Sequence, residues 1–323
     1  MLDTDNSTER LLKPLIKQFV QNIEYKGAIP GDDLDTLLKG MHEYAYHTGI
    51  PYCEGRRASQ SFRTGVYYAL FCYPNHPLDV RIYTGIYAWL AVLVDHEAEV
   101  HPAEWQEFLP RFHGGLQQAS SIAQSWAEHL RLCYKYYSPV VANFIVTSSL
   151  NFTNATTLEL STLPKIARTA GGQRWPFYIR DKVGVAEAFA YLSFPRDCCP
   201  DISCYIEAIS DMNTYLNLTN DILSFYKEEK AGEKHNYIHN RAFYERRNVY
   251  AVLQDIIEEN LEAHHRICLS LDGKDRYARA WHEHAMGFVT FHTAGDRYRL
   301  CELGLGERYT DETGAITALR QSV

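Results

Sequence analysis

Apolar residues recur at helical spacing along most of the chain, in long stretches that contain neither proline nor glycine. Strict alternation of apolar and polar residues, which is typical of half-buried strands, is nearly absent. The pattern therefore predicts an all-α protein. By residue number, the predicted helices are 9–24, 34–46, 59–71, 78–98, 103–112, one within 116–136, 139–156, 175–191, 202–229, 242–271 and 276–303.

The breaks between these helices are short and rich in proline, glycine and small polar residues. They lie at residues 73–77, 170–172, 199–201, 230–232 and 304–306. The sequence contains no long Pro- or Ser-rich linker and no internal repeat. We therefore expect one domain over residues 1–323, ending in a polar tail at about 304–323. About ten helices in one domain can enclose a cavity.

Composition and charge narrow the classes of function. Of the 323 residues, 46% are hydrophobic and 13% are aromatic, and 23 Tyr supply enough rings to line a pocket. The formal net charge of −8 argues against a nucleic-acid-binding protein, because such proteins gather Lys and Arg into a basic field. An anionic ligand would need metal ions or a few well-placed cations in this chain.

The cysteines and the N-terminal residues predict a cytoplasmic protein. Eight Cys are dispersed along the chain, and the first residues show no basic segment followed by an apolar one. Cys198, Cys199 and Cys204 lie close in sequence, but they lack the paired spacing of a zinc site. The longest apolar run, residues 82–94, is too short to span a bilayer, so we expect a buried helix there and no membrane anchor. The sequence leaves open whether the chain forms a homodimer.

Asn220, Ser224 and Glu228 carry the most specific chemical signal in the sequence. At helical spacing these residues fall within an arc of roughly 80° on one face of a helix. An amide oxygen, a hydroxyl and a carboxylate then converge. These are hard ligands, which suit Mg²⁺ that is shared with the phosphate oxygens of a substrate. The spacing therefore predicts a metal site that binds a diphosphate.

A solvent-exposed polar face is the alternative interpretation of this spacing. The neighbouring apolar residues Ile222, Leu223 and Phe225 leave little room for a polar exterior. Asn213 and Asn217 also extend the polar stripe backwards along the same predicted helix. We therefore favour a buried site over a solvated face.

The run from Asn220 to Glu228 resembles the second metal motif of the class I terpene cyclases, which reads (Asn or Asp)-Asp-x-x-(Ser or Thr)-x-x-x-Glu. Its wording is especially similar to that of the fungal trichodiene synthase-like sesquiterpene synthase family. The resemblance implies that Asn220, Ser224 and Glu228 hold one Mg²⁺. It also implies that Lys227 contacts the diphosphate.

The same family has an aspartate-rich motif at the end of an earlier apolar helix, where two further Mg²⁺ ions bind. The similar stretch here is Asp95-His96-Glu97-Ala98-Glu99, and its spacing places Asp95 and Glu99 on one helix face. The resemblance thus implies three Mg²⁺ ions, with Asp95 and Glu99 among their ligands. His96 stands where the family has a second Asp, and the sequence leaves open whether His96 or Glu97 has a role.

Two smaller matches extend the resemblance over roughly residues 60–305. Asp296-Arg297-Tyr298 is similar to the Arg-Tyr pair that the family places after its C-terminal helix, which implies that Arg297 and Tyr298 donate to the diphosphate. Arg180 stands ahead of Gly184, where the family has a diphosphate-sensing arginine. A surface ion pair is the alternative for a lone Arg.

The resemblance implies a fold, a reaction and a partner. The fold is the class I terpenoid synthase helical bundle around a central active-site cavity. The reaction is the Mg²⁺-dependent ionisation and cyclisation of farnesyl diphosphate to a cyclic sesquiterpene hydrocarbon or alcohol, with release of diphosphate. The partner is accordingly a small-molecule prenyl diphosphate.

An apolar, aromatic cavity suits this reaction, because ring faces stabilise a cation. Among the aromatic residues on the relevant helices we expect Tyr68, Tyr87 and Phe291 to contact the substrate. Most aromatic residues at helical spacing belong only to a core. The other candidates are Tyr67, Phe71, Trp89 and Phe288.

Two alternatives stay open. A chain-elongating prenyltransferase would carry two Asp-Asp-x-x-Asp motifs, whereas this chain has the Asn220 motif in the second place. An all-α binding protein that has lost its activity is the other alternative, and His96 in the first motif is the reason to consider it.

Overall fold

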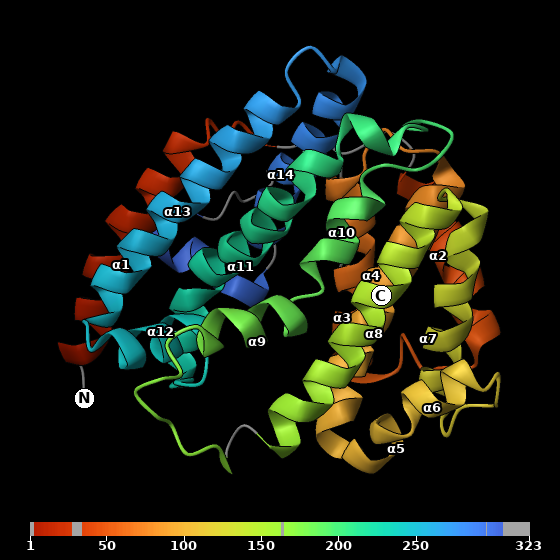
Figure 1. Cartoon of the computed structure of the whole chain (residues 1–323), viewed down its shortest axis with the longest axis horizontal. Helices are drawn as coiled ribbons and strands as arrows, with labels where there is room; N and C mark the ends of the chain where they lie inside the picture. Colours follow the sequence, from red (N-terminus) through yellow and green to blue (C-terminus); the bar gives the residue numbers. More distant parts are fainter. Residues whose placement is uncertain (1–2, 28–33, 163–164, 295, 306–323) are drawn as a thin grey trace.

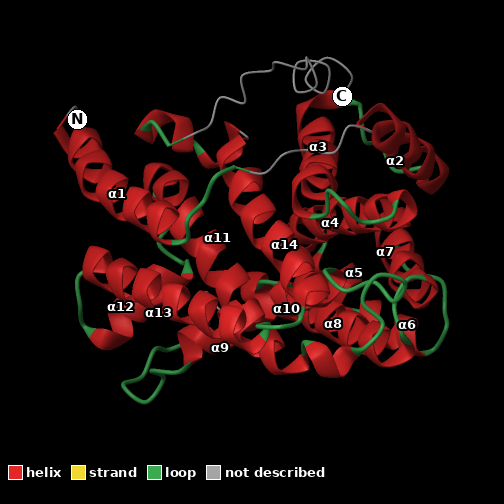
Figure 2. Ribbon diagram, turned by 90° about the horizontal axis from the view of Figure 1, so that it is seen from above, coloured by secondary structure: helices red, strands yellow, loops and turns green. Residues whose placement is uncertain are grey.

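The computed structural model describes residues 3–27, 34–162, 165–294 and 296–305 (Figure 1). Within these ranges the chain forms helices, turns and loops and no strand, which confirms the all-α prediction (Figure 2). Most of the predicted polar tail, from residue 306 onwards, lies outside the described residues. None of the described helices is both long and apolar enough to cross a membrane.

The described residues form fourteen α-helices and several 3₁₀ turns. The helices are α1 (Asp3–Asn22), α2 (Leu34–Thr48), α3 (Gly55–Cys72), α4 (Leu78–Val100), α5 (Pro102–Gln106), α6 (Phe108–His113), α7 (Ser121–Leu132), α8 (Pro139–Ser161), α9 (Trp175–Val183), α10 (Ala186–Leu192), α11 (Ile209–Ala231), α12 (Tyr237–Glu245), α13 (Val249–Ser270) and α14 (Asp275–Ala294). The 3₁₀ turns are η1 (Cys133–Lys135), η3 (Ile202–Cys204), η4 (Ile206–Ala208), η5 (Asp296–Tyr298) and η6 (Leu300–Leu303).

Backbone conformations with positive φ explain why some predicted helices are shorter than expected. The helix predicted at 175–191 is divided into α9 and α10 by Val185, whose φ is 50°. Arg246, with a φ of 54°, separates α12 from α13 at the edge of the prediction for 242–271. An α-helix needs negative φ at every residue, so each of these conformations ends one.

Other differences occur at helix ends. The predicted helix within 116–136 begins only at Ser121, because the Ser120 side chain caps it by accepting from the Ala123 amide. The helix predicted at 202–229 starts at Ile209 after two 3₁₀ turns and ends before Gly232, whose φ is 75°. The helix predicted at 276–303 ends at Ala294, and the one at 103–112 divides at Glu107.

Six helices contact one another in a closed ring that runs α3, α4, α8, α10, α11, α14 and back to α3 (Figures 1 and 2). The remaining helices cover this ring from outside. Helices α1 and α13 pack on α11, α2 and α7 pack on α4, and α9 contacts both α8 and α11. The ring places residues that are distant in sequence around one interior.

Most of helix α4 is buried in this ring. The apolar run at residues 82–94 forms its centre, as predicted, and Trp89, Leu90 and Tyr87 are fully buried there. The two ends of the helix reach solvent, at Asp79 in the first turn and from Asp95 onwards at the C-terminal end. The position of α4 therefore brings the first acidic motif to the rim of the ring.

Candidate active site

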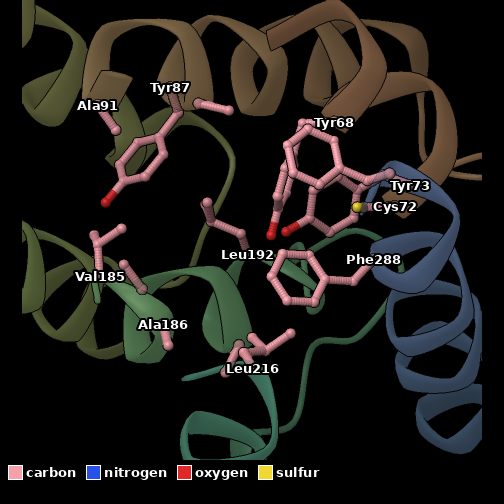
Figure 3. Packing of buried hydrophobic residues seen from close by; sticks show 14 of the residues in the cluster. Tyr68, Cys72, Tyr73, Tyr87, Ala91, Val185, Ala186, Leu192, Leu216 and Phe288 are labelled. Atoms are coloured by element: carbon pink, nitrogen blue, oxygen red, sulfur yellow. The ribbon is translucent and has the colours of Figure 1, made fainter. Parts of the chain in front are cut away.

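A cavity of about 220 Å³ lies inside the ring of helices. Figure 3 shows some of the apolar side chains of its wall, among them Tyr68, Val185 and Phe288. Each of the six ring helices contributes to its wall, together with the α9–α10 junction and η5. The wall is formed by Thr64, Tyr68, Ala88, Ala91, Val92, Asp95, Phe152, Arg180, Val183, Gly184, Val185, Ala186, Phe189, Leu216, Asn220, Phe288, Phe291, Arg297 and Tyr298.

Five of the residues predicted to bind metal or diphosphate meet in this wall. They are Asp95 from α4, Arg180 from α9, Asn220 from α11, and Arg297 and Tyr298 from η5. They are separated by up to about two hundred positions in sequence, so only the closure of the ring brings them together. Most of the remaining wall is apolar, which gives the cavity a polar part and a hydrocarbon-compatible part.

The amide of Asn220 is held in one orientation by two neighbours. His292 Nδ1 donates to the Phe288 carbonyl at 2.7 Å, so His292 Nε2 accepts from Asn220 Nδ2 at 3.1 Å. Arg180 Nη2 donates to Asn220 Oδ1 at 3.1 Å. A carbonyl oxygen has two lone pairs, so Asn220 Oδ1 keeps one for a metal ion.

Arg180 forms a buried ion pair with Asp221. Its Nε donates to both carboxylate oxygens at 2.7 and 2.9 Å, and Nη2 also donates to the Asn217 carbonyl at 3.0 Å. The two side chains are only 12% and 8% exposed. The pKa of Asp221 is raised to about 7. Burial is the main cause, Arg180 opposes it by favouring the charged carboxylate, and the nearby Glu228 adds to the rise. The surface ion pair weighed above as the alternative for Arg180 is therefore excluded.

Gly184 allows Arg180 to approach α11. A Cβ atom at residue 184 would collide with Asn217 Oδ1 and with Arg180 Nη1. The next residue, Val185, has a left-handed conformation that β-branched residues rarely adopt, and it lines the cavity. Such strain persists only where the surrounding packing enforces it, which is common at ligand sites.

Ser224 lies one turn after Asn220 on the same face of α11. It is 2% exposed, and its Oγ has no hydrogen-bond partner among the described residues. A buried hydroxyl without a partner costs roughly 1–3 kcal/mol. A metal ligand role would satisfy this oxygen.

Glu228 follows one further turn along α11. Asn236 Nδ2 donates to Glu228 Oε2 at 2.8 Å, while the Asn236 Oδ1 atom caps the start of α12 by accepting from His239 N at 2.9 Å. Lys227 Nζ lies 4.0 Å from Glu228 Oε1. Neither residue lines the cavity wall itself, so Lys227 and Glu228 stand at the edge of the site.

The acidic motif of α4 has a different character. Asp95 lines the cavity and is solvent-accessible, and Glu99 is exposed one turn later. Burial in the surrounding protein raises the pKa of Asp95, Glu99 adds to this effect, and His96, Arg297 and Lys227 oppose it. The electrostatic influence of Arg297 and Lys227 shows that cations from two other elements act on this carboxylate.

His96 and Glu97 do not line the cavity that Asp95 lines. His96 lines a wider mouth of about 470 Å³ that shares Phe291, Arg297 and Tyr298 with the cavity. Glu97 instead faces His101, with Oε2 at 3.8 Å from Nε2. The structure thus separates the two residues whose roles the sequence left open.

The mouth of the cavity is basic although the chain is acidic overall. Arg56, Arg57 and Arg63 from α3 line it together with Arg297. Such a local field attracts anionic ligands against a net charge of −8. The sequence analysis predicted the need for local cations but did not identify these three arginines.

Two of the three aromatic residues expected at the substrate line the cavity, and one does not. Tyr68 and Phe291 belong to the wall, as does Phe288. Tyr87 is fully buried behind the wall, where its hydroxyl contacts Ser149 Oγ at 2.6 Å, and it is not among the cavity-lining residues. The prediction that Tyr87 contacts the ligand conflicts with this placement, because the side chain is used in packing α4 against α8.

The donor set fits Mg²⁺ on structural grounds. Asn220 presents an oriented amide oxygen, Ser224 a buried hydroxyl without a partner, and Glu228 and Asp95 carboxylates. Within the described ranges no three His, Cys, Asp or Glu side chains gather closely enough to hold a metal by themselves. Oxygen atoms of a bound ligand would complete the coordination.

Sequence reasoning missed three residues that organise the site. Asp221 pairs with Arg180, His292 orients Asn220, and Asn236 holds Glu228. Asp221 lies inside the motif from Asn220 to Glu228 and His292 lies in the predicted helix at 276–303, but spacing along one helix does not identify a partner on another helix. Nothing in the local pattern distinguishes Asn236 from an ordinary helix cap.

The chain is similar to known proteins over most of its length. A family model described as trichodiene synthase (TRI5) matches residues 45–316. Terpene synthase BipA of Cochliobolus sativus is 40% identical over 292 residues, which cover 90% of this chain and 89% of that protein. Longiborneol synthase CLM1 of Gibberella zeae is 36% identical over 304 residues, covering 92% of this chain and 88% of that protein.

A solved structure shares the fold at low sequence identity. The linalool/nerolidol synthase from Streptomyces clavuligerus, solved in complex with 2-fluorogeranyl diphosphate, superposes with a TM-score of 0.59 at 15% identity. The match covers 84% of this chain and 97% of that one. It supports the helical architecture and, at this identity, nothing finer.

Proposed function

The chain belongs to the trichodiene synthase family and is a terpene synthase, and from this premise we propose a specific reaction. The enzyme ionises farnesyl diphosphate in the presence of Mg²⁺ and cyclises the resulting cation to a sesquiterpene, releasing diphosphate. The product class is a cyclic hydrocarbon or alcohol. Asp95, Arg180, Lys227, Arg297 and Tyr298 are the proposed catalytic residues.

The polar end of the cavity would bind the diphosphate. Arg297 and Tyr298 line the cavity and can donate to phosphate oxygens, and Arg180 lies beside Asn220 in the same wall. Lys227 acts electrostatically on Asp95 and His292 and so lies near enough to add positive charge. Groups arranged in advance around a developing anion lower the barrier to its release.

The metal ligands would be Asn220, Ser224 and Glu228 on one side and Asp95 and Glu99 on the other. Three Mg²⁺ ions, when bound, would neutralise the leaving diphosphate as the C–O bond breaks. The protein residues have separate tasks: His292 and Arg180 orient the Asn220 amide, and Asn236 holds the Glu228 carboxylate. Closure around the ligand would exclude water that otherwise traps the cation.

The apolar part of the cavity would hold the isoprenoid chain. Tyr68, Phe288 and Phe291 present rings there, with the ring centroids of Tyr68 and Phe291 5.4 Å apart. Ring faces stabilise a nearby cation by up to about 2 kcal/mol when water is excluded. The apolar part of the wall thus stabilises cationic intermediates. At most of its positions it has no nucleophile that could react with them.

The single observation that carries the proposal is the position of Asn220. Its oriented amide lies between a buried arginine and a buried histidine, and it opens into the same cavity as Asp95 and Arg297. One turn further on, Ser224 adds a buried hydroxyl that has no hydrogen-bond partner among the described residues.

Purified protein incubated with farnesyl diphosphate and Mg²⁺ tests the proposal. We expect a cyclic C15 product in the organic extract by gas chromatography with mass detection, and one diphosphate released per product. Chelation with EDTA should abolish turnover, and added Mg²⁺ should restore it. Geranyl and geranylgeranyl diphosphate serve as C10 and C20 comparisons, and turnover of only one of these would overturn the C15 assignment.

The same extracts distinguish the alternatives. A longer prenyl diphosphate formed with added isopentenyl diphosphate would identify a chain-elongating enzyme. No turnover of C10, C15 or C20 diphosphates would support an inactive binding protein, and diphosphate binding could then be measured by calorimetry. No structural observation favours either alternative over cyclisation.

A further inference from the structure

Behind the aromatic wall, three buried polar side chains from three ring helices form a continuous chain of hydrogen bonds. The Tyr68 hydroxyl on α3 lies 3.0 Å from His284 Nε2 on α14. His284 Nδ1 lies 2.7 Å from the Oγ of Ser193, the residue that ends α10. All three side chains are buried, and His284 and Ser193 are 0% exposed.

The hydrogen bonds of this chain have a consistent direction. Burial lowers the pKa of His284 to about 3, so its imidazole is neutral and carries one N–H. Ser193 Oγ lies 3.5 Å from the Phe189 carbonyl and can donate to it. When His284 Nδ1–H donates to Ser193, Nε2 accepts from the Tyr68 hydroxyl. The Tyr68 oxygen also interacts with the Tyr73 hydroxyl and the Cys72 thiol.

Tyr68 is the one member of this chain that lines the cavity. The other polar wall residues, apart from Thr64, belong to the proposed diphosphate end, and Thr64 Oγ1 already donates to Gln60 O at 2.9 Å. Around Tyr68 lie the rings of Phe189 and Phe291, with centroids 4.4 and 5.4 Å away. Figure 3 shows Tyr68 gathered with Tyr73 and Phe288. Tyr68 thus adds a hydroxyl group with a base behind it to an otherwise apolar part of the wall, and the Tyr73 hydroxyl and the Cys72 thiol interact with this hydroxyl from the protein interior.

We infer that Tyr68 and His284 accept the proton whose loss ends the cyclisation, an inference that rests on the function proposed above. A C–H bond next to the cationic carbon breaks, and its electron pair forms the C=C bond of the product. The proton goes to the Tyr68 oxygen while the Tyr68 O–H proton moves to His284 Nε2. The imidazolium that results keeps donating through Nδ1 to Ser193. After the product leaves, the proton returns through Tyr68 to water that enters the cavity.

The low basicity of His284 suits this task. A carbocation is a far stronger acid than an imidazolium ion, so even a strongly depressed imidazole is basic enough. A more basic group would be protonated from solvent before the reaction and would be lost as an acceptor. The arrangement also places the acceptor on the apolar wall and so gives the last step a defined position, which diphosphate at the polar end would not.

Solvent isotope effects on the unsubstituted enzyme test the inference without any change in the fold. The protons on Tyr68 and His284 exchange with solvent, whereas the carbon-bound protons of the substrate do not. After equilibration in D₂O, the ratio of the main hydrocarbon to prematurely quenched products should fall by about 1.5-fold or more. An unchanged ratio in D₂O, or an alcohol as the sole product, would overturn the inference.

Three substitutions complete the experiment. Tyr68→Phe and His284→Gln should each lower the share of the main hydrocarbon at least fivefold, with earlier-quenched products in its place, and should remove the D₂O effect on the product ratio. Tyr137→Phe is the matched control, because Tyr137 is also fully buried, but its hydroxyl donates to the Leu192 carbonyl at 3.0 Å and it does not line the cavity. Tyr137→Phe should keep both the product profile and the isotope effect.

The outcomes separate the inference from the proposed function. Continued diphosphate release with an unchanged product profile in Tyr68→Phe and His284→Gln would overturn the relay and leave the cyclase assignment standing. The same altered profile in Tyr137→Phe would show that the loss of any buried hydroxyl in this region changes the products, which also overturns the relay. Absence of diphosphate release from the unsubstituted chain would overturn both.

Discussion

The two halves of the proposed metal site differ in how much of their geometry the protein supplies. On α11, Arg180 and His292 fix Asn220, and Asn236 holds Glu228. On α4, Asp95 and Glu99 make no hydrogen bond or ion pair within the described residues, and both reach solvent. The α11 half is therefore held in place by the protein itself, whereas no hydrogen bond among the described residues holds the α4 carboxylates.

The position of each motif along its helix explains the difference. Asn220 and Ser224 lie in the buried middle of α11, where neighbouring helices surround them. Asp95 and Glu99 lie in the last turns of α4, where the helix dipole is negative and disfavours carboxylates. A bound cation relieves that unfavourable charge. The α11 half thus provides ligands in fixed positions, and the α4 half provides carboxylates whose negative charge a cation would stabilise.

Of the changes predicted for the two halves, removing the Asn220 amide should lower kcat/KM the most. Asn220→Ala is expected to lower kcat/KM by about 10³-fold, because it deletes a ligand of the organised half. Glu228→Ala should act in the same direction while circular dichroism shows an intact fold. Asn213→Ala is the control on the same helix, since Asn213 contacts Asp181 outside the cavity wall. Activity within threefold of the parent in both Asn220→Ala and Glu228→Ala would remove the metal assignment.

Replacing Arg180 should damage both activity and stability. Arg180→Lys loses the planar fork that reaches Asp221, Asn217 and Asn220 together, and it leaves the Asp221 carboxyl poorly paired. We expect kcat/KM to fall about 10²-fold and the free energy of unfolding to fall by about 3 kcal/mol, as measured by urea denaturation.

Arg266→Lys provides the control for Arg180. Arg266 forms a similar fork with Asp211, but its side chain is 51% exposed. Exposed ion pairs contribute little, so this variant should change the free energy of unfolding by less than about 0.5 kcal/mol. Equal losses in the two variants would show that the burial of the Arg180 pair does not matter.

The α4 half should lose activity without losing stability. Asp95→Asn is expected to lower kcat/KM by up to about 10²-fold and to raise the Mg²⁺ concentration needed for half-maximal rate. Glu99→Gln should do the same more weakly, by about tenfold. The free energy of unfolding should stay within about 0.5 kcal/mol, because neither carboxylate is paired in the protein. A destabilised Asp95→Asn variant would contradict the contrast between the two halves.

Acidification should lower the free energy of unfolding while the hydrogen bond from Asn220 to the neutral His292 stays in place. Burial lowers the pKa of His76 to about 4 and those of His129, His284 and His292 to about 3. These side chains stay neutral in the folded chain and gain a proton on unfolding below about pH 6.5. Their stabilising contribution is complete above that pH and is lost as the pH falls towards the folded pKa values.

Urea unfolding at pH 7.5, 6.5 and 5.5 measures this effect. Each buried histidine contributes at most about 1.4 kcal/mol per pH unit, and the raised pKa of Asp221 acts in the opposite direction. His129→Gln should make the pH dependence shallower, whereas the exposed His113→Gln should leave it as it is. If the free energy of unfolding depended on pH equally in the parent and in His129→Gln, the lowered pKa of His129 in the folded chain would be contradicted.

Some parts of the prediction rested on information that is local in sequence. Apolar periodicity identified the helices, because each helix buries one face and the period of that face is written along the chain. The spacing of Asn220, Ser224 and Glu228 likewise placed three oxygens on one face, and the structure keeps them there. The single domain over residues 1–323 and the cytoplasmic location stay predictions.

Other features could not be read from local pattern. The break at Val185 needs a positive φ that tertiary packing imposes on a β-branched residue. The displacement of Tyr87 from the cavity depends on how α4 meets α8 and on its contact with Ser149. Both depend on residues of other helices. Ser149 lies 62 positions from Tyr87, and Asn217 of α11 packs against Gly184 beside Val185, so no short window along the sequence contains the cause.

The sequence alone determined the helical class, because the helix period is a property of neighbouring residues. Motif spacing is also local, so the sequence likewise determined the acidic motif at Asp95, the metal motif at Asn220 and the family that both resemble. Only the tertiary structure decided which partner each of these residues has. Asp221 could have been a metal ligand by spacing, yet it pairs with Arg180. His284 had no assigned role, yet it stands behind Tyr68. Partners of this kind depend on the closure of six helices around one cavity, since that closure sets which side chains lose water together.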